Sequence, residues 1–335
     1  MKPAHQTMLL NVMLLAGVMG LFVTSLMWGE TRIMFSHALA DLLAGRHTAG
    51  AIIVERLRLP RTLLAILVGG TLGLSGAVLQ GYLRNPLADP GILGVSGGAA
   101  LGAVSVFYTG LMQVSIAALP LGGLTGALCA AAVLMGLVGR GGTLVLLLAG
   151  AALSSFAAAL TTLVLNLVPS PYASFEIMHW LMGSLTDRTF THVWICLPGV
   201  VCGTLLMLSS GRALDALTLG EDVAASLGFQ LHGPRGVQTR IVLGAALAVG
   251  SCVAVSGAIG FVGLVVPHLL RPLVGFQPSR LLLPSFLGGS LLLLLADMVV
   301  RLVAVGPELQ LGVLTALVGA PVFFARVIML KRTVS

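Results

Sequence analysis

The chain has 335 residues, of which 57% are hydrophobic and only 9% are charged. Soluble domains carry roughly 25% charged residues, so this composition excludes a water-soluble globule, and the high hydrophobicity excludes a disordered chain. The net charge of +7 could suggest a nucleic-acid partner, but the basic residues lie in short scattered clusters with few aromatic residues among them, so we expect none. The sequence therefore predicts an integral membrane protein surrounded by a lipid bilayer, and its 43 glycines are typical of closely packed membrane helices.

Runs without charged residues mark the predicted membrane spans, each of which needs about 20 apolar residues. We predict an all-α membrane protein with about ten transmembrane helices, at residues 8–28, 62–83, 92–108, 115–138, 143–167, 191–210, 240–258, 260–274, 281–301 and 311–330. The first is interpreted as a retained span, because residues 24–28 offer no small-residue cleavage site. The even count places both termini on one side, and the excess of arginine and lysine in the loops of that side predicts the cytoplasm.

Two longer polar loops interrupt this pattern, one expected outside at 29–61 and one expected inside at 211–239. The inner loop contains helix-forming residues, with glycines at 220 and 228 and acidic residues directly after Gly220. It therefore predicts two short surface helices, near 214–228, that are suited to binding a partner. At the end of the outer loop, Arg56, Arg58 and Arg61 crowd together. They could be arginines that snorkel at a helix end or a basic docking surface for an acidic partner.

A weak internal repeat is visible. Ser75-Gly76-Ala77 and Ser256-Gly257-Ala258 each have a proline ten residues after the glycine, at Pro86 and Pro267. The two tripeptides lie on the second and seventh predicted spans, which run in opposite directions. Inverted repeats of this kind are typical of transporters.

The segment Gly94-Val95-Ser96-Gly97-Gly98 matches the G-x-S-x-G pattern of serine hydrolases. An intramembrane hydrolase that uses Ser96 is therefore a remote alternative. Because Gly94, Gly98 and Gly102 recur every four residues on an apolar helix, close helix packing is the favoured interpretation.

Other energy sources and cofactors can be weighed from the same residues. The sequence contains no G-x-x-x-x-G-K-[ST] motif, so we expect a protein that is not an enzyme and leaves any ATP hydrolysis to a separate subunit. A secondary transporter would need ionisable residues inside its spans, and here Asp297, which is spaced for an ion pair with Arg301, is nearly alone. The four cysteines lie in apolar runs without metal-type spacing, so we expect no metal site and no cofactor bound by this chain.

Several longer segments carry a resemblance. They are Arg56-Leu57-Arg58-Leu59-Pro60-Arg61-Thr62, Leu74-Ser75-Gly76-Ala77-Val78-Leu79-Gln80, the segment 84–96, Trp180-Leu181-Met182-Gly183-Ser184, Leu219-Gly220-Glu221, the segment 256–271 and Gly319-Ala320-Pro321-Val322-Phe323. In this order the chain resembles the FecCD family, the membrane permeases of ABC importers for iron–siderophore complexes, haem and vitamin B12.

The resemblance implies a type II ABC importer permease fold, in which residues 1–335 form a single permease domain with inverted-repeat halves. It implies a multi-pass protein of the bacterial inner membrane with both termini in the cytoplasm. The implied partners are a second copy of the chain, two ATP-binding subunits that hold ATP and Mg²⁺, and a periplasmic substrate-binding protein.

The resemblance also implies roles for individual residues. Docking of the binding protein falls to Arg58, Arg61 and Arg301. The inner gate corresponds to Asn85, Pro86 and Leu87, with a second gate segment at Thr143 and Leu144. Coupling to the ATPase corresponds to Leu219, Gly220, Glu221, Ala224, Leu227 and Gly228. The translocation path corresponds to Ser154, Ser155, Thr162 and Asn166 on the fifth span, and His179 is a further candidate.

The function that this resemblance implies is ATP-driven import of an iron chelate, either haem or a ferric siderophore, by alternating access. Import of vitamin B12 is the alternative cargo, because no residue of the expected path chooses between these large molecules.

Overall fold

The computed structural model describes residues 3–29, 31, 33–139, 141–303 and 309–321, and over this part of the chain it contains helices and no strands. The helices are α1 (Pro3–Met27), α2 (Phe35–Leu43), α3 (Ala49–Ile52), α4 (Leu59–Tyr82), α5 (Val95–Thr109), α6 (Ala118–Val138), α7 (Thr143–Leu167), α8 (Pro171–Leu181), α9 (Phe190–Leu208), α10 (Gly211–Leu217), α11 (Glu221–Ser226), α12 (Val237–Ser256), α13 (Val262–Leu270), α14 (Pro278–Val303) and a last helix, Leu311–Pro321. A π-helical turn, Ile53–Arg58, joins α3 to α4, and 3-10 turns lie at Pro90–Leu93, Leu111–Gln113 and Arg271–Val274.

The apolar helices agree with the predicted spans. Among the described residues, 7 helical segments are long and apolar enough to cross a membrane, and Val95–Thr109, Val262–Val274 and Leu311–Pro321 are shorter apolar helices. Taken in order, these segments correspond to the ten predicted spans, so the all-α membrane fold is confirmed. Of the last predicted span, residues 322–330 lie outside the described residues.

The second span begins earlier than the charge pattern predicts. The helical segment is continuous over Ala49–Tyr82, 34 residues in all, whereas the predicted span was 62–83. The charges at Arg58 and Arg61 do not end the helix because both side chains find partners inside the protein. The helix α8 was not predicted, because it is short and contains Glu176 and His179.

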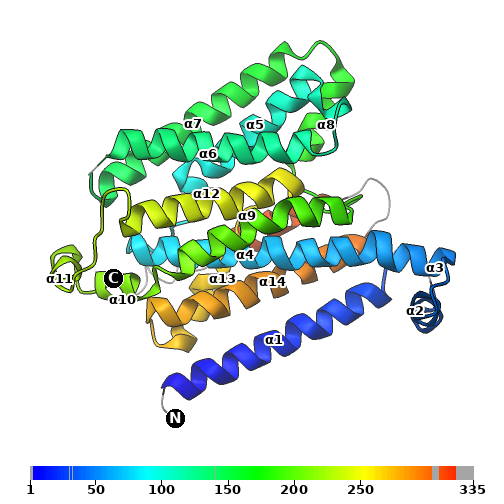
Figure 1. Cartoon of the computed structure of the whole chain (residues 1–335), viewed down its shortest axis with the longest axis horizontal. Coiled ribbons are helices and arrows are strands. Elements are labelled where there is room, and N and C mark those ends of the chain that lie inside the picture. The colour runs from blue at the N-terminus through cyan, green and yellow to red at the C-terminus, as the bar shows by residue number, and fades with distance from the viewer. Residues whose placement is uncertain (1–2, 30, 32, 140, 304–308, 322–335) are drawn as a thin grey trace.

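Burial separates central from peripheral helices. In their most apolar stretches, Ala49–Tyr82 is 83% buried and Val237–Ser256 is 78% buried, against 11% for His5–Met27 and 17% for Thr143–Leu167. In Figure 1, α4 and α12 accordingly lie in the middle of the bundle, with α14, α13 and α9 packed against α4, while α1 and α7 lie at its two margins. The outer faces of α1 and α7 are therefore available to lipid or to a second chain.

The two ends of the bundle differ in what they carry. The short helices α10 and α11, which were predicted in the 211–239 loop, lie together at one end, and α2 and α3 lie at the opposite end (Figure 1). We call these the α11 end and the α2 end. The long helices run between them, so each end gathers residues that are distant in the sequence.

Glycines bring α5 and α6 into close contact. A Cβ atom on Gly102 would overlap the carbonyl oxygen of Gly122, and one on Gly126 would overlap the carbonyl oxygen of Gly98. Close approach of this kind is the reason that small residues are enriched between membrane helices. The predicted packing function of Gly98 and Gly102 is confirmed.

The matching tripeptides do not occupy matching positions. Ser75-Gly76-Ala77 lies inside α4, whereas Ser256 ends α12 and the following Gly257 has a φ of +70°. The tripeptide match therefore does not identify equivalent residues.

Candidate functional site

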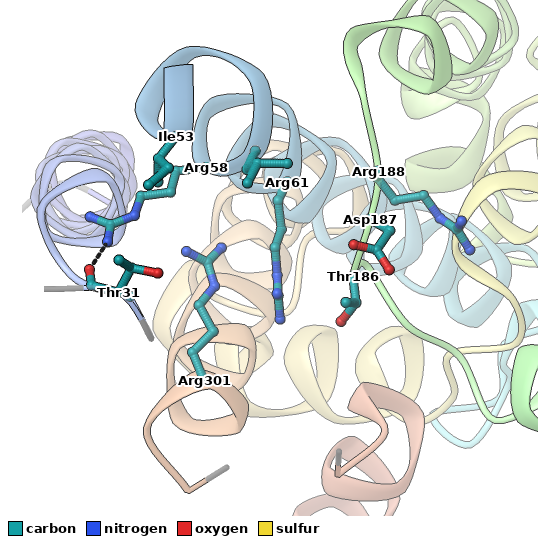
Figure 2. A pocket seen from close by; sticks show the side chains of 10 residues that line it. Thr31, Ile53, Arg58, Arg61, Thr186, Asp187, Arg188 and Arg301 are labelled. Carbon is teal, nitrogen blue, oxygen red and sulfur yellow. Dashed lines mark hydrogen bonds between the residues drawn. The ribbon is translucent and has the colours of Figure 1, made fainter. Parts of the chain in front are cut away.

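At the α2 end, Arg58 is turned toward the end of α1. Its guanidinium donates hydrogen bonds to the carbonyl oxygens of Leu26 (2.8 Å), Met27 (2.9 Å) and Thr31 (2.6 Å), and only 5% of the residue is exposed. The last carbonyls of a helix lack partners and carry its negative dipole end, so a cation is favoured there. Figure 2 shows the Arg58 side chain reaching Thr31.

Asp297 of α14 joins the other two predicted docking arginines. Its carboxylate accepts a hydrogen bond from Arg61 Nε at 2.8 Å and one from the Arg301 guanidinium, and only 1% of its side chain is exposed. Arg301 also donates to the Ser25 carbonyl oxygen at 3.2 Å. The cluster thus ties α1, α4 and α14 together at the α2 end.

The three arginines border a cavity of about 200 Å³ that is also lined by Asp187 and Arg188 (Figure 2). Within the cluster, Arg61 and Arg301 share the single carboxylate of Asp297, and Arg58 binds only backbone carbonyls, so the positive charge is only partly neutralised. Burial lowers the pKa of Arg188, and the neighbouring Asp187 carboxylate opposes this shift. The electrostatic surface at this end therefore favours an anionic partner.

At the α11 end, three predicted segments meet at one carboxylate. Glu221, the first residue of α11, accepts a hydrogen bond from Thr143 Oγ1 at 3.1 Å, and its Oε1 lies 3.5 Å from the guanidinium of Arg84. Thr143 is the first residue of α7, and Arg84 lies in the loop after α4. The structure therefore brings both predicted gate segments to the predicted coupling helix.

The loop after α4 has a defined conformation. The Asn85 side chain accepts a hydrogen bond from the Leu87 amide at 2.9 Å, and the Asp89 side chain accepts one from the Gly91 amide at 2.9 Å. Arg84 adopts a left-handed φ of 49°, which is unfavourable for a residue with a Cβ atom. Pro86 and Leu87 are exposed at the tip of this loop.

Gln80 connects α4 to α13 next to this loop. It is 1% exposed, its Oε1 accepts a hydrogen bond from Arg271 at 2.6 Å, and its Nε2 lies within 3.4 Å of the carbonyl oxygens of Ala88, Gly263 and Leu264. Buried amides need such partners, because an unsatisfied polar group is costly. Gln80 thus fixes the base of the loop against α13.

The coupling segment presents an apolar surface. Leu219, Val223 and Leu227 are 68%, 41% and 61% exposed. Val223 and Leu227 are four residues apart along α11 and its C-terminal end, which places them on one face, and Leu219 lies just before the helix. Ala224 is fully buried, and Gly220 and Gly228 adopt positive φ at the two ends of α11. Exposed apolar ridges of this kind on a polar surface mark contacts with another protein.

The predicted path residues lie mainly on α7. Ser154 donates to the Gly91 carbonyl oxygen at 2.9 Å, whereas Thr162 and Asn166 are exposed and bond to carbonyls of their own helix. Ser155 is exposed. Leu144, at the start of α7, is 69% exposed.

His179 lies on α8 rather than on α7. Its Nε2 lies 2.7 Å from the Gln310 side-chain nitrogen, and its ring is 6.0 Å from that of Phe175. It is therefore held at the α2 end, next to the last helix.

The described residues do not support the hydrolase alternative. No hydrogen bond joins Ser96 to a histidine or an acidic residue in the described part of the chain, and Gly98 two residues later is a packing position. Across the same residues, no group of three or more histidine, cysteine or acidic side chains could hold a metal ion.

A family model for the FecCD transport family matches residues 14–331. The chain belongs to the FecCD transport family. As a FecCD member it is a transport permease subunit of an ABC importer and a multi-pass inner membrane protein. Permeases of this kind work with ATPase subunits and substrate-binding proteins.

Individual relatives agree with this assignment. The chain is 41% identical over 282 residues to the uncharacterized ABC transporter permease protein YvrB of Bacillus subtilis (strain 168), covering 81% of this chain and 77% of that protein. It is 40% identical over 285 residues to the vitamin B12 import system permease protein BtuC of Salmonella paratyphi A, covering 84% and 85%.

A solved structure shows the same fold. It is an ABC transporter assigned to the metal-chelate type, in an inward-facing conformation, with 30% identity, a TM-score of 0.81, and coverage of 96% of this chain and 99% of that one. The fold class predicted for this FecCD permease, an all-α type II importer permease with inverted-repeat halves, is confirmed.

Three contributors to these two sites were not assigned a function from the sequence. Asp297 was paired only with Arg301, and its second partner, Arg61, lies 236 residues away in the chain. Arg84 was placed in the loop without a partner, and Val223 was not included in the coupling set. The spacing of four between Val223 and Leu227, within the acidic-led helical segment after Gly220, is the signal that could have added Val223.

Proposed function

We propose that this chain is the permease subunit of an ATP-driven importer that moves a large metal chelate across the inner membrane by alternating access. The observation that carries the proposal is the pairing of two unlike ends on one bundle. The α2 end has a partly neutralised arginine cluster, and the α11 end has an apolar ridge next to two gate segments.

In this proposal the α2 end faces the periplasm and receives the binding protein. Arg61, the most exposed of the three, presents positive charge, whereas Arg58 and Arg301 also hold the end of α1 in place through hydrogen bonds to its carbonyls. A second copy of the chain presents the same cluster again, so that a two-lobed binding protein with acidic surfaces meets one cluster on each lobe.

The α11 end then faces the cytoplasm, and both termini lie on that side. The ridge of Leu219, Val223 and Leu227 seats in a cleft of the ATPase, which holds the ATP and Mg²⁺. Closure of the two ATPase subunits moves α11. ATP and the binding protein shift the permease between its inward-open and outward-open states only because each binds the two states with different affinity.

Two cargoes are supported by different observations. Vitamin B12 is favoured by the identity to BtuC, and an iron chelate, haem or a ferric siderophore, is favoured by the broader family resemblance. Both are large chelates of a metal. The exposed face of α7, with Thr162 and Asn166 among apolar side chains, offers only weak polar contacts, which suits release of a bulky cargo.

The test is uptake by proteoliposomes that contain the permease with its cognate ATPase and binding protein. Haemin, ferrichrome and cyanocobalamin are offered separately, with and without internal ATP. We expect ATP-dependent uptake of one of the three, and no uptake when the ATPase carries an inactive P-loop. Uptake that proceeds without ATP hydrolysis, or no uptake of any of the three chelates, would contradict the proposal.

A further inference from the structure

We propose that the Glu221 carboxylate is the positioning group that ties α11 to both gate segments, so that one movement of α11 displaces the two gates together. The inference rests on the proposed function, because it needs an ATPase that moves α11. It gives Glu221 a role inside the permease, distinct from contact with the ATPase surface.

The geometry supports a shared link. The same oxygen, Oε1, accepts the hydrogen bond from Thr143 and faces the guanidinium of Arg84, at 3.1 and 3.5 Å. Thr143 begins α7, and Arg84 precedes Asn85 and Pro86 directly in the loop after α4. A displacement of Glu221 therefore changes both contacts at once.

The backbone around Glu221 allows such a displacement. Asp215 of α10 is held to the start of α14 by hydrogen bonds from Ser279 N (2.8 Å), Ser279 Oγ (2.6 Å) and Gln277 Nε2 (2.8 Å). Gly220, between α10 and α11, has a φ of +111° with open space around it. Glycine adopts such angles at low cost, so α11 can turn at Gly220 while α10 stays in place.

The contact between Arg84 and Glu221 is weak enough to break and form again during transport. The side chains of Arg84 and Glu221 are 47% and 36% exposed. Ion pairs at this exposure contribute little to folding, so they can break and form again without unfolding the protein. Loss of the link should therefore change the coupling between ATP and the gates and leave the fold intact.

The experiment measures gate movement independently of the cargo. The permease, with Cys129, Cys196, Cys202 and Cys252 replaced by serine or alanine and a single reporter Leu144→Cys, is assembled with its ATPase and binding protein in nanodiscs. The rate of maleimide labelling is measured with and without ATP, alongside ATP hydrolysis and the melting temperature. The variants are Glu221→Gln, Arg84→Gln, their combination, Thr143→Val and the conservative Thr143→Ser.

In the parent we expect ATP to change the labelling rate about fivefold or more, the lower end of typical coupling between sites. Glu221→Gln and Arg84→Gln should reduce that change to about twofold or less, because loss of an exposed ion pair shifts an equilibrium by up to about fivefold. The double variant should be no worse than either single one, and Thr143→Ser should behave like the parent while Thr143→Val does not. The melting temperature of every variant should stay at the parent's value, because the exposed ion pair contributes little to folding.

Matched controls are Arg235→Gln and Glu176→Gln, which remove exposed charges outside this contact. If Glu221→Gln and Arg84→Gln keep the full ATP-dependent change in labelling, or if the controls lose it equally, the inference is wrong. A parent complex that hydrolyses no ATP and shows no ATP-dependent labelling would overturn the proposed function and this inference with it.

Discussion

A single buried carboxylate organises the α2 end. Asp297 lies between Arg61 and Arg301 with 1% of its side chain exposed. Taking an ion out of water costs several kcal/mol, which its partners must offset, so removal of one member leaves the others uncompensated. The arginines proposed to dock the binding protein are thus held in position by a buried residue, Asp297.

The substitution Asp297→Asn should lower stability by about 3 kcal/mol, because two guanidinium groups lose their shared counter-ion. The measurement is the melting temperature in detergent, followed by intrinsic tryptophan fluorescence. The control is Asp41→Asn, which removes an exposed pair with Arg46 at 3.7 Å and should cost less than about 1 kcal/mol. Equal melting temperatures for the two variants would show that Asp297 does not organise the cluster.

The limits of sequence reasoning are clearest for these residues. The spacing of Asp297 and Arg301 on one helix predicts their pair, because residues four apart share a helical face. The contact with Arg61 and the bonds from Arg58 to the end of α1 depend on how distant helices pack, and no local pattern encodes that. The same holds for the meeting of Arg84, Thr143 and Glu221.

At the scale of the elements, glycine patterns explain how α5 and α6 pack. Gly98 and Gly102 of α5 face Gly122 and Gly126 of α6 so closely that no Cβ atom fits between them. In a membrane, such packing contributes much of the attraction between helices, because lipid tails are as apolar as leucine. The four-residue spacing was visible in the sequence, and it identified the seam on α5 correctly.

Two alanine substitutions on α6 separate this effect from helix propensity. Gly126→Ala should destabilise the protein by about 2 kcal/mol or more, because the added methyl group overlaps the Gly98 carbonyl. Gly136→Ala, where no atom lies within 4 Å, should be neutral or stabilising by up to about 1 kcal/mol. Melting temperatures in detergent provide the comparison, and a similar shift for both variants would argue against the seam.

Helix existence was more predictable than helix limits. Charge-free runs identify spans because the bilayer interior tolerates few ions, and the described helices follow those runs in order. The start of the second span was missed because its arginines are neutralised by protein groups. The helix α8 was missed because it has only 11 residues and contains polar side chains, so it does not form an apolar run long enough to be recognised as a span.

At the scale of the whole molecule, charge is concentrated where partners are expected. Docking to the arginine cluster should therefore be accelerated by long-range attraction, which salt screens. We expect the association rate of the binding protein with the permease complex to fall about tenfold between 50 and 500 mM salt.

Removal of one cluster charge tests the location of this effect. Arg61→Gln should lower the association rate at low salt and flatten its salt dependence, whereas Arg46→Gln, a paired and largely exposed arginine at the same end, should leave both nearly unchanged. Surface plasmon resonance on nanodisc-embedded complexes gives both quantities. An Arg61→Gln complex with the parent's salt dependence would move the docking surface elsewhere.

The continuous helix over Ala49–Tyr82 has a mechanical consequence. Its 34 residues extend about 51 Å at 1.5 Å per residue, roughly 20 Å more than the hydrocarbon core of a bilayer. It starts beyond the arginine cluster and ends two residues before Arg84. One continuous helix therefore connects the two ends of the bundle. Helices bend at π-helical turns, and this one has such a turn at Ile53–Arg58. Docking of a protein at the α2 end could therefore tilt the helix and shift the loop after α4, which contains Arg84.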